Sequence, residues 1–412
     1  TLEAYAKIRK ASRAEAIAGA RDFAALPEAC GKLEKAIKDL RLVFEQDAVR
    51  LPAHQLDGVA KFAPALQELE TQLAQLDSLL QTQAERSEGL LRCQQRAAEL
   101  AAQLARWQQP GDADWVRWVE VFSHGMQLNR TPLAVDNLFR KQVEGNAKAW
   151  VFTSATLAVD GNFQHFCGEL GLDDAATGCW DSPFDYKSQA LLYVPKQMPQ
   201  PNSAEFTQAV VEQAWPALLA SQGRAFLLFT SLRAMREAYE LAKRRFDEQQ
   251  LDYPLLLQGE GSRTELLEKF RTSPHAVLVA SQTFWEGVDV RGDALQLVVI
   301  DKLPFAPPDD PVLAARVEQM NKAGRNPFME FQLPRAAITL KQGAGRLIRD
   351  ETDRGVLIIC DTRLVDKPYG KKIWKSLPPM LKTRDASVIP RFFAQSIESS
   401  GEAVDSPATD PI

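Results

Sequence analysis

The strongest candidates for chemistry lie in one stretch near the C-terminal end of the sequence, residues 340–361, and they are Gln342, Gly345, Arg346 and Arg349. These residues fall within one helix-sized stretch, and the three-residue spacing of the two arginines predicts that both guanidinium groups project from one helical face. Paired guanidinium forks suit a polyphosphate, because each offers a planar set of donors. Gly345 would permit close approach of another backbone. The alternative is a solvated basic helix end that pairs with Asp350 and Glu351.

A second candidate segment, ASQTFWEGVDVRGD, follows the apolar run AVLVA and contains Thr283, Glu286, Gly287 and Asp289. The hydroxyl groups of Ser281 and Thr283 are placed to meet a phosphate. The two carboxylates could accept hydrogen bonds from a ribose or order a neighbouring arginine. The alternative is an ordinary turn from strand to helix, with Trp285 filling the core.

Three shorter segments place polar groups directly after predicted strands, and their candidates are Ser154, Thr156, Thr230, Ser231 and Gln258. Thr230 and Ser231 also open a predicted helix, whose N-terminus is a ready anion site. Gln258 precedes a glycine-rich turn. The hydroxyl groups of Ser154 and Thr156 could equally act as caps of the next helix.

Several expected patterns are absent from these 412 residues. No GxxxxGK[ST] sequence is present to cradle nucleotide phosphates. Residues 350–353 read DETD, but they precede a predicted strand instead of ending one, which indicates a turn and not a Walker B acid pair. The four histidines are scattered and support no metal site. The five cysteines include no CxxC pair, which fits buried thiols in a reducing cytoplasm.

Residues 1 to about 110 are rich in strong helix formers. An apolar stripe runs from Leu66 to Leu80 at spacings of three and four, and resumes from Cys93 to Trp107. Two helices or one kinked helix fit this pattern. An internal bundle is preferred over a coiled-coil surface, because the stripe breaks after about two heptads.

After residue 111 short apolar runs alternate with helical patterns, which predicts an α/β fold with a mostly parallel sheet. The predicted strands lie within residues 149–155, 189–195, 224–230, 255–257, 276–281, 295–301 and 355–361. In such sheets ligands sit beyond the carboxyl ends of the strands. From about residue 387 the pattern weakens and predicts a flexible acidic tail.

The composition is that of an ordinary globular protein, with 45% hydrophobic residues and a formal net charge of −5. This charge argues against a histone-like DNA binder, although a narrow basic groove remains compatible with it. No apolar stretch approaches the roughly 18 residues of a membrane span.

Taken in order, the segments resemble the motifs of DinG/YoaA-type (XPD-like) superfamily 2 DNA helicases. TSATL resembles motif III, RAFLLFTS motif IV, residues 281–312 an extended motif V, and residues 333–364 motif VI. The resemblance covers about residues 150–385, and WEGVD together with QGAGRLIR makes it specific. It implies a RecA-like second motor domain at 181–386, the end of a first motor domain at 112–180, and an arch-like helical insertion at 1–111.

The resemblance also implies roles. Arg346 and Arg349 would act as arginine fingers on the γ-phosphoryl group of ATP, with Gln342, Gly345, Glu286, Gly287 and Asp289 lining the same cleft. Ser154 and Thr156 would couple nucleotide state to DNA grip. Thr230, Ser231, Gln258 and Thr283 would contact phosphates of single-stranded DNA.

The family further implies ATP and Mg²⁺ bound mainly by an N-terminal part that carries Walker A, a 4Fe–4S module and a DEAH box. None of these is recognisable here, so the chain alone is expected to be inactive. Single-stranded and forked DNA, a replication or repair protein, a monomeric state and 5′-to-3′ polarity are further expectations. The alternatives are a non-catalytic DNA- or replisome-binding module and an unrelated α/β enzyme such as a phosphotransferase.

Overall fold

The computed structural model describes residues 1–45, 49–110, 113–123, 125–145, 148–281, 284, 290 and 292–401, with side chains described up to residue 394. The chain forms two compact units. The first comprises residues 1–138 and 307–325, and the second residues 139–306 and 326–412. The first unit therefore extends beyond residue 111, where the sequence predicts a boundary, and it also takes a segment from within the predicted second motor domain.

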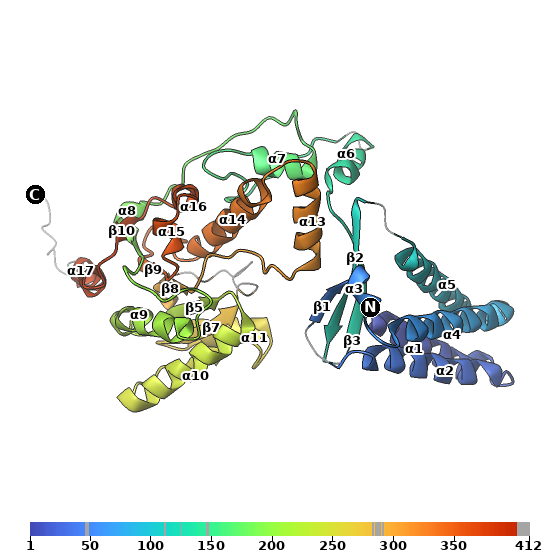
Figure 1. Cartoon of the computed structure of the whole chain (residues 1–412). Coiled ribbons are helices and arrows are strands. Elements are labelled where there is room, and N and C mark those ends of the chain that lie inside the picture. The colour runs from blue at the N-terminus through green and yellow to red at the C-terminus, as the bar shows by residue number, and fades with distance from the viewer. Residues whose placement is uncertain are drawn as a thin grey trace, which may run out of the picture. The chain divides into compact units, whose positions relative to one another are not determined.

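The first unit is a helical bundle with a small antiparallel sheet (Figure 1). Its elements are α1 (Leu2–Gly19), α2 (Ala25–Leu42), β1 (Val49–Pro52), α3 (Ala53–Leu56), α4 (Phe62–Gln83), η1 (Ala84–Arg86), α5 (Glu88–Gln108), β2 (Trp115–Phe122), β3 (Gly125–Pro132) and α13 (Pro311–Lys322). Helix α6 (Asp136–Glu144) spans the boundary between the units.

The leucine stripe forms the core of this bundle, because Leu69, Leu73, Leu76 and Leu80 are completely buried. The stripe belongs to two helices, because α4 ends at Gln83 and α5 begins after the N-cap residue Ser87. The Ser87 hydroxyl accepts from the N–H of Leu90 at 3.1 Å. The prediction of an internal bundle is thus confirmed.

The sheet of the first unit has the order β1-β2-β3, and helix α13 packs on β1 and β2. Asp310 caps α13 by accepting from two N–H groups of its first turn. The same carboxylate pairs with Arg50 of β1 at 3.1 Å, and Arg50 also pairs with Glu120 of β2 at 2.8 Å. A segment from far along the chain is therefore built into this unit.

The second unit is a three-layer α/β structure around a seven-stranded parallel sheet of order β10-β4-β9-β8-β5-β7-β6 (Figure 1). Its strands are β4 (Ala190–Tyr193), β5 (Ala225–Phe229), β6 (Leu255–Leu257), β7 (Val277–Ser281), β8 (Leu297–Ile300), β9 (Gly355–Ile359) and β10 (Leu381–Thr383). Every residue of β4, β5, β7, β8 and β9 is buried, as expected for a parallel sheet covered on both faces.

Helices cover the two faces of this sheet. One face packs on α11 (Arg263–Thr272), α14 (Leu333–Ala344) and α16 (Gly370–Ser376), and the other on α9 (Phe206–Ala220), α10 (Leu232–Gln249) and α17 (Val388–Gly401). Shorter helices are α7 (Gln164–Leu170), α8 (Tyr186–Gln189), η2 (Gly292–Ala294), η3 (Phe328–Gln332) and α15 (Arg363–Asp366).

Two predictions about this unit do not hold within these 412 residues. Residues 149–155 form no strand, and Val151 is 81% exposed, because no described segment pairs with this stretch of backbone. The predicted tail begins instead with helix α17, which is anchored by the buried side chains of Ile389, Phe392 and Phe393. Residues 402–412 lie outside the described part of the chain.

Candidate functional site

Polar residues follow the strands of the second unit along the carboxyl edge of the sheet. Thr230 follows β5, Gln258 follows β6, Asp301 follows β8, and Asp361 comes two residues after β9. Because the strands are parallel, these residues occupy one edge in the order of the strands. The predicted DNA-contacting residues Thr230, Ser231 and Gln258 therefore lie along the same edge, with β7 between the strands that carry them.

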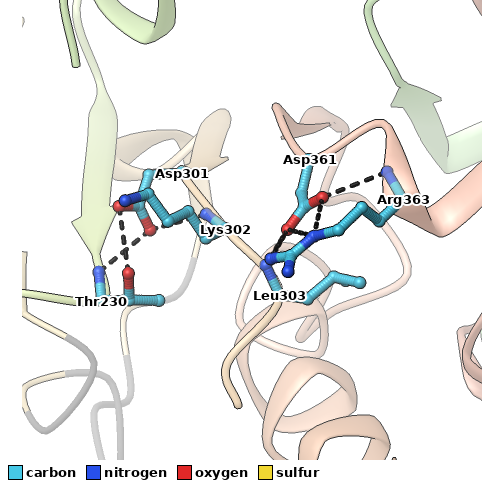
Figure 2. A network of polar contacts seen from close by, with 6 residues as sticks. All are labelled: Thr230, Asp301, Lys302, Leu303, Asp361 and Arg363. Atoms are coloured by element: carbon cyan, nitrogen blue, oxygen red, sulfur yellow. Dashed lines mark hydrogen bonds and ion pairs between the residues drawn. The ribbon is translucent and has the colours of Figure 1, made fainter. Parts of the chain in front are cut away.

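Asp301 holds Thr230 in place (Figure 2). Its Oδ1 accepts from the N–H of Thr230 at 2.9 Å and from that of Lys302 at 2.6 Å, and the Thr230 hydroxyl lies 3.2 Å from Oδ2. Burial raises the pKa of Asp301 to about 7, although Lys302 and the hydrogen bonds from Thr230 oppose this shift. The carboxyl group therefore titrates near neutral pH.

A second buried carboxylate, that of Asp361, follows the neighbouring strand β9 (Figure 2). Asp361 is completely buried and accepts from the N–H of Leu303 at 2.9 Å and from the Arg363 Nε at 2.8 Å. The hydrogen bonds to Asp361 raise the pKa of the Arg363 guanidinium, which also lies over the ring of Phe305 at 5.8 Å. This pair fixes the backbone that follows β8.

The other candidate side chains of this edge are held by local bonds. Ser231 caps α10, with its hydroxyl accepting from the N–H of Ala234 at 3.2 Å. The Gln258 Oε1 accepts from the N–H of Ser281 at 2.7 Å and from its hydroxyl at 2.9 Å. The side-chain oxygen of Gln258 is thus used to tie the ends of β6 and β7 together.

The arginine segment lies at the opposite, amino edge of the sheet, because it directly precedes β9. Helix α14 ends at Ala344, Gly345 is its C-terminal cap, and Arg346 lies in a turn. The prediction that Arg346 and Arg349 share a helical face is therefore wrong. Both project from a short non-helical loop, and both are partly buried.

Gln342 stays within α14 and meets the hydroxyl-rich TSAT segment. Its Nε2 donates to the Thr156 hydroxyl at 3.4 Å, and this hydroxyl also lies 3.2 Å from that of Ser154. The structure thus brings Gln342, Thr156 and Ser154 together.

Residues 350–353 form a turn, as predicted. No pattern in the sequence indicated, however, that Asp353 is 7% exposed and accepts from the N–H groups of Arg349 at 2.6 Å and Asp350 at 2.8 Å. Sequence reasoning also passed over Asp301 and Asp361. An acidic residue directly after a wholly apolar run was the available signal for these two, because a buried carboxylate must be hydrogen-bonded.

Four predicted site residues, Thr283, Glu286, Gly287 and Asp289, lie outside the described residues. Within the described part of the chain, no three His, Cys, Asp or Glu residues are placed to hold a metal ion. The five cysteines do not provide the four gathered thiolates of a 4Fe–4S cluster. Cys30, Cys93 and Cys360 are buried as predicted, whereas Cys179 is exposed and Cys167 is intermediate. No described helix is both long and apolar enough for a membrane span.

Comparison with known proteins shows which proteins the chain is similar to. Residues 215–380 match the helicase C-terminal domain family. The chain is 41% identical to the ATP-dependent DNA helicase YoaA of Haemophilus influenzae over 90% of its own length and 58% of that protein. It is 38% identical to the ATP-dependent helicase DinG of Mycobacterium tuberculosis H37Ra over 64% of its length and 39% of that protein.

The chain is therefore similar to DinG/YoaA-type helicases, and it matches a helicase C-terminal domain. Its fold is similar to that of a solved XPD helicase, with a TM-score of 0.56 at 15% identity over 93% of this chain and 64% of that one. The second unit is therefore a RecA-like helicase fold, as the sequence predicted. The chain spans little more than half the length of the YoaA relative.

Proposed function

We propose that the chain is the C-terminal part of an ATP-dependent DNA helicase that couples ATP hydrolysis to movement along single-stranded DNA. The contact between Gln342 and Thr156 carries this proposal, because it joins the motif VI helix to the motif III segment. A motor needs such a connection, so that the state of the nucleotide reaches the DNA-gripping residues.

In this proposal the amino edge of the sheet contacts ATP and the carboxyl edge contacts DNA. Arg346 and Arg349, at the amino edge, would stabilise charge on the transferring γ-phosphoryl group, with Gln342 and Gly345 beside them. Thr230, Ser231 and Gln258, at the carboxyl edge, would bind DNA phosphates through hydroxyl, amide and backbone N–H donors. Thr283, Glu286, Gly287 and Asp289 keep their proposed roles of phosphate contact and cleft lining.

We assign the first unit to the arch-like insertion and residues 139–180 to the end of the first motor domain. Exposed apolar side chains of that segment, Trp150, Val151 and Phe152, fit a strand that pairs with chain outside these 412 residues. ATP and Mg²⁺ would be held mainly by that further chain, as would a 4Fe–4S cluster. The 412 residues alone would then be inactive. Forked DNA, 5′-to-3′ polarity and action in repair or replication complete the proposal.

The test is ATP hydrolysis by the intact gene product, with and without single-stranded DNA. We expect the Arg346→Ala variant to lose about a thousandfold or more of its DNA-stimulated turnover. Arg244→Ala is the matched control, because Arg244 is an exposed arginine on α10 whose described hydrogen bond goes to a helix carbonyl. A rate of ATP hydrolysis that changes neither with single-stranded DNA nor with the Arg346 substitution would favour the non-catalytic binding module instead.

A further inference from the structure

The loop between α14 and β9 carries both candidate arginines, and its backbone is held by the buried carboxylate of Asp353. One oxygen, Oδ2, accepts from the N–H of Arg349 at 2.6 Å and from that of Asp350 at 2.8 Å. The Arg349 backbone is thus bonded directly to a side chain that is 7% exposed. A loop without regular structure depends on such bonds for a fixed conformation, because its N–H groups have no helix or sheet partners.

A second buried side chain holds the carbonyl groups of the same loop. The Gln189 Nε2 lies 2.9 Å from the carbonyl oxygens of Asp350 and Glu351 and 3.0 Å from that of Asp353. Gln189 is 7% exposed and directly precedes β4, the strand that pairs with β9. An acceptor side chain therefore binds the loop's N–H groups, and a donor side chain binds its carbonyl groups.

The remaining oxygen of Asp353 fastens the loop to another part of the site. Oδ1 accepts from the N–H of Gly292 at 3.1 Å. Gly292 has a φ of +73° and is the first residue of η2. In the sequence Gly292 comes three residues after the candidate Asp289. A single carboxylate thus joins the arginine loop to Gly292, which lies within the motif V segment.

We propose that Asp353 is a positioning residue for Arg346 and Arg349, and that Gln189 assists it from the other side of the loop. This inference rests on the proposed function. Three N–H donors converge on the Asp353 carboxylate, which accepts at both oxygens. An asparagine of the same shape would turn an NH₂ group toward at least one of these donors, so Asp353→Asn should shift the loop without leaving a cavity.

Small displacements matter for a residue that must reach a transferring phosphoryl group. A misplacement of about 1 Å can slow a reaction by about a hundredfold, because catalytic groups act only at defined positions. The effect should appear in kcat and leave KM for ATP nearly unchanged, since the bulk of ATP binding would come from other residues.

The experiment measures kcat and KM for ATP in the intact gene product with saturating single-stranded DNA. We expect Asp353→Asn to lower kcat by about a hundredfold. The control is Ser221→Ala, which also removes a buried polar anchor of a loop beside the sheet, with its hydroxyl 2.7 Å from the Gly223 carbonyl. The control should melt at a temperature similar to that of Asp353→Asn but keep its turnover.

A double-mutant cycle separates positioning from a general structural effect. When Arg346 and Arg349 are both replaced by alanine, Asp353→Asn should lower kcat no further. If Asp353→Asn proves poorly folded, Gln189→Met takes its place in the same cycle, because it removes the donor without adding charge.

The outcomes are distinct. Wild-type kcat in Asp353→Asn, or a loss of the same size with and without the arginines, overturns the positioning role while the helicase proposal stands. Wild-type kcat in the double arginine variant overturns the proposed function and the positioning role with it.

Discussion

The side-chain amide of Gln342 donates to the hydroxyl of Thr156 at 3.4 Å, although the two residues are 186 positions apart. Thr156→Val removes this hydroxyl and keeps the shape of the side chain. A single neutral hydrogen bond is worth about 0.5–1.5 kcal/mol, so we expect the stimulation of ATP hydrolysis by DNA to fall by up to about tenfold. Steady-state turnover with and without single-stranded DNA in the intact gene product measures this effect.

Thr153→Val is the matched control for that variant, because Thr153 is exposed and makes no hydrogen bond among the described residues. Equal losses in the two variants would show that the contact with Gln342 has no special role.

Asp301 should make stability depend on pH. Its folded pKa of about 7 is raised by burial above the ordinary value of 3.8. The folded state therefore binds more protons between these values, and stability is greatest below about pH 4 and falls as pH rises through about 7. Asp301→Asn imitates the neutral carboxyl, with an oxygen for the two N–H donors and an NH₂ group for the Thr230 hydroxyl.

We therefore expect the free energy of unfolding of Asp301→Asn to vary less between pH 4 and 7 than that of the wild type. Urea unfolding across this range provides the measurement, and each unit of pKa separation corresponds to about 1.4 kcal/mol. An unchanged slope would contradict the assignment of this pH dependence to Asp301.

The ion pair of Arg363 and Asp361 should contribute to stability, because Asp361 is completely buried. Arg363→Met leaves the carboxylate with backbone donors alone and should lower the free energy of unfolding by about 3 kcal/mol. Lys269→Met, which removes an exposed positive charge from α11, should change it by less than about 0.5 kcal/mol. Chemical unfolding of both variants compares the two, and equal effects would exclude a stabilising role for the pair.

The segment 150–153 provides a test of the proposed domain assignment. In the 412-residue chain its backbone N–H groups are outside any strand or helix, and Val151 is 81% exposed. These amides should exchange with solvent rapidly in the isolated chain and slowly in the intact gene product, where a sheet would protect them. Rapid exchange in both proteins would contradict a strand at this position.

The sequence predicted the parallel sheet well because β4, β5, β7, β8 and β9 are continuous apolar runs, which full burial on both faces requires. The prediction of a strand around Val151 did not hold, because a strand also needs a neighbouring strand to pair with, and an apolar run does not show whether one is present. The sequence pattern also missed β1–β3 and the transfer of residues 307–325 to the first unit, since these depend on contacts far apart in sequence.

The candidate site shows the same division. The motifs identified Arg346 and Arg349 by residue type, but periodicity could not show that α14 ends at Ala344. The conformation after that point depends on bonds from Asp353 and Gln189, and the spacing of arginines carries no information about these. The sequence thus identified the arginines that could bind phosphate, whereas Asp353 and Gln189, which bind the backbone of their loop, could be recognised only in the structure.

The placement of α13 has a practical consequence for dissecting the protein. The polypeptide passes between the two units three times, so no single cut separates them. A gene product that stops at residue 138 would present the β1-β2 surface without its covering helix, and Arg50 without Asp310. A faithful excision or exchange of this unit between homologues must graft residues 307–325 as well, joined to the rest by a designed linker.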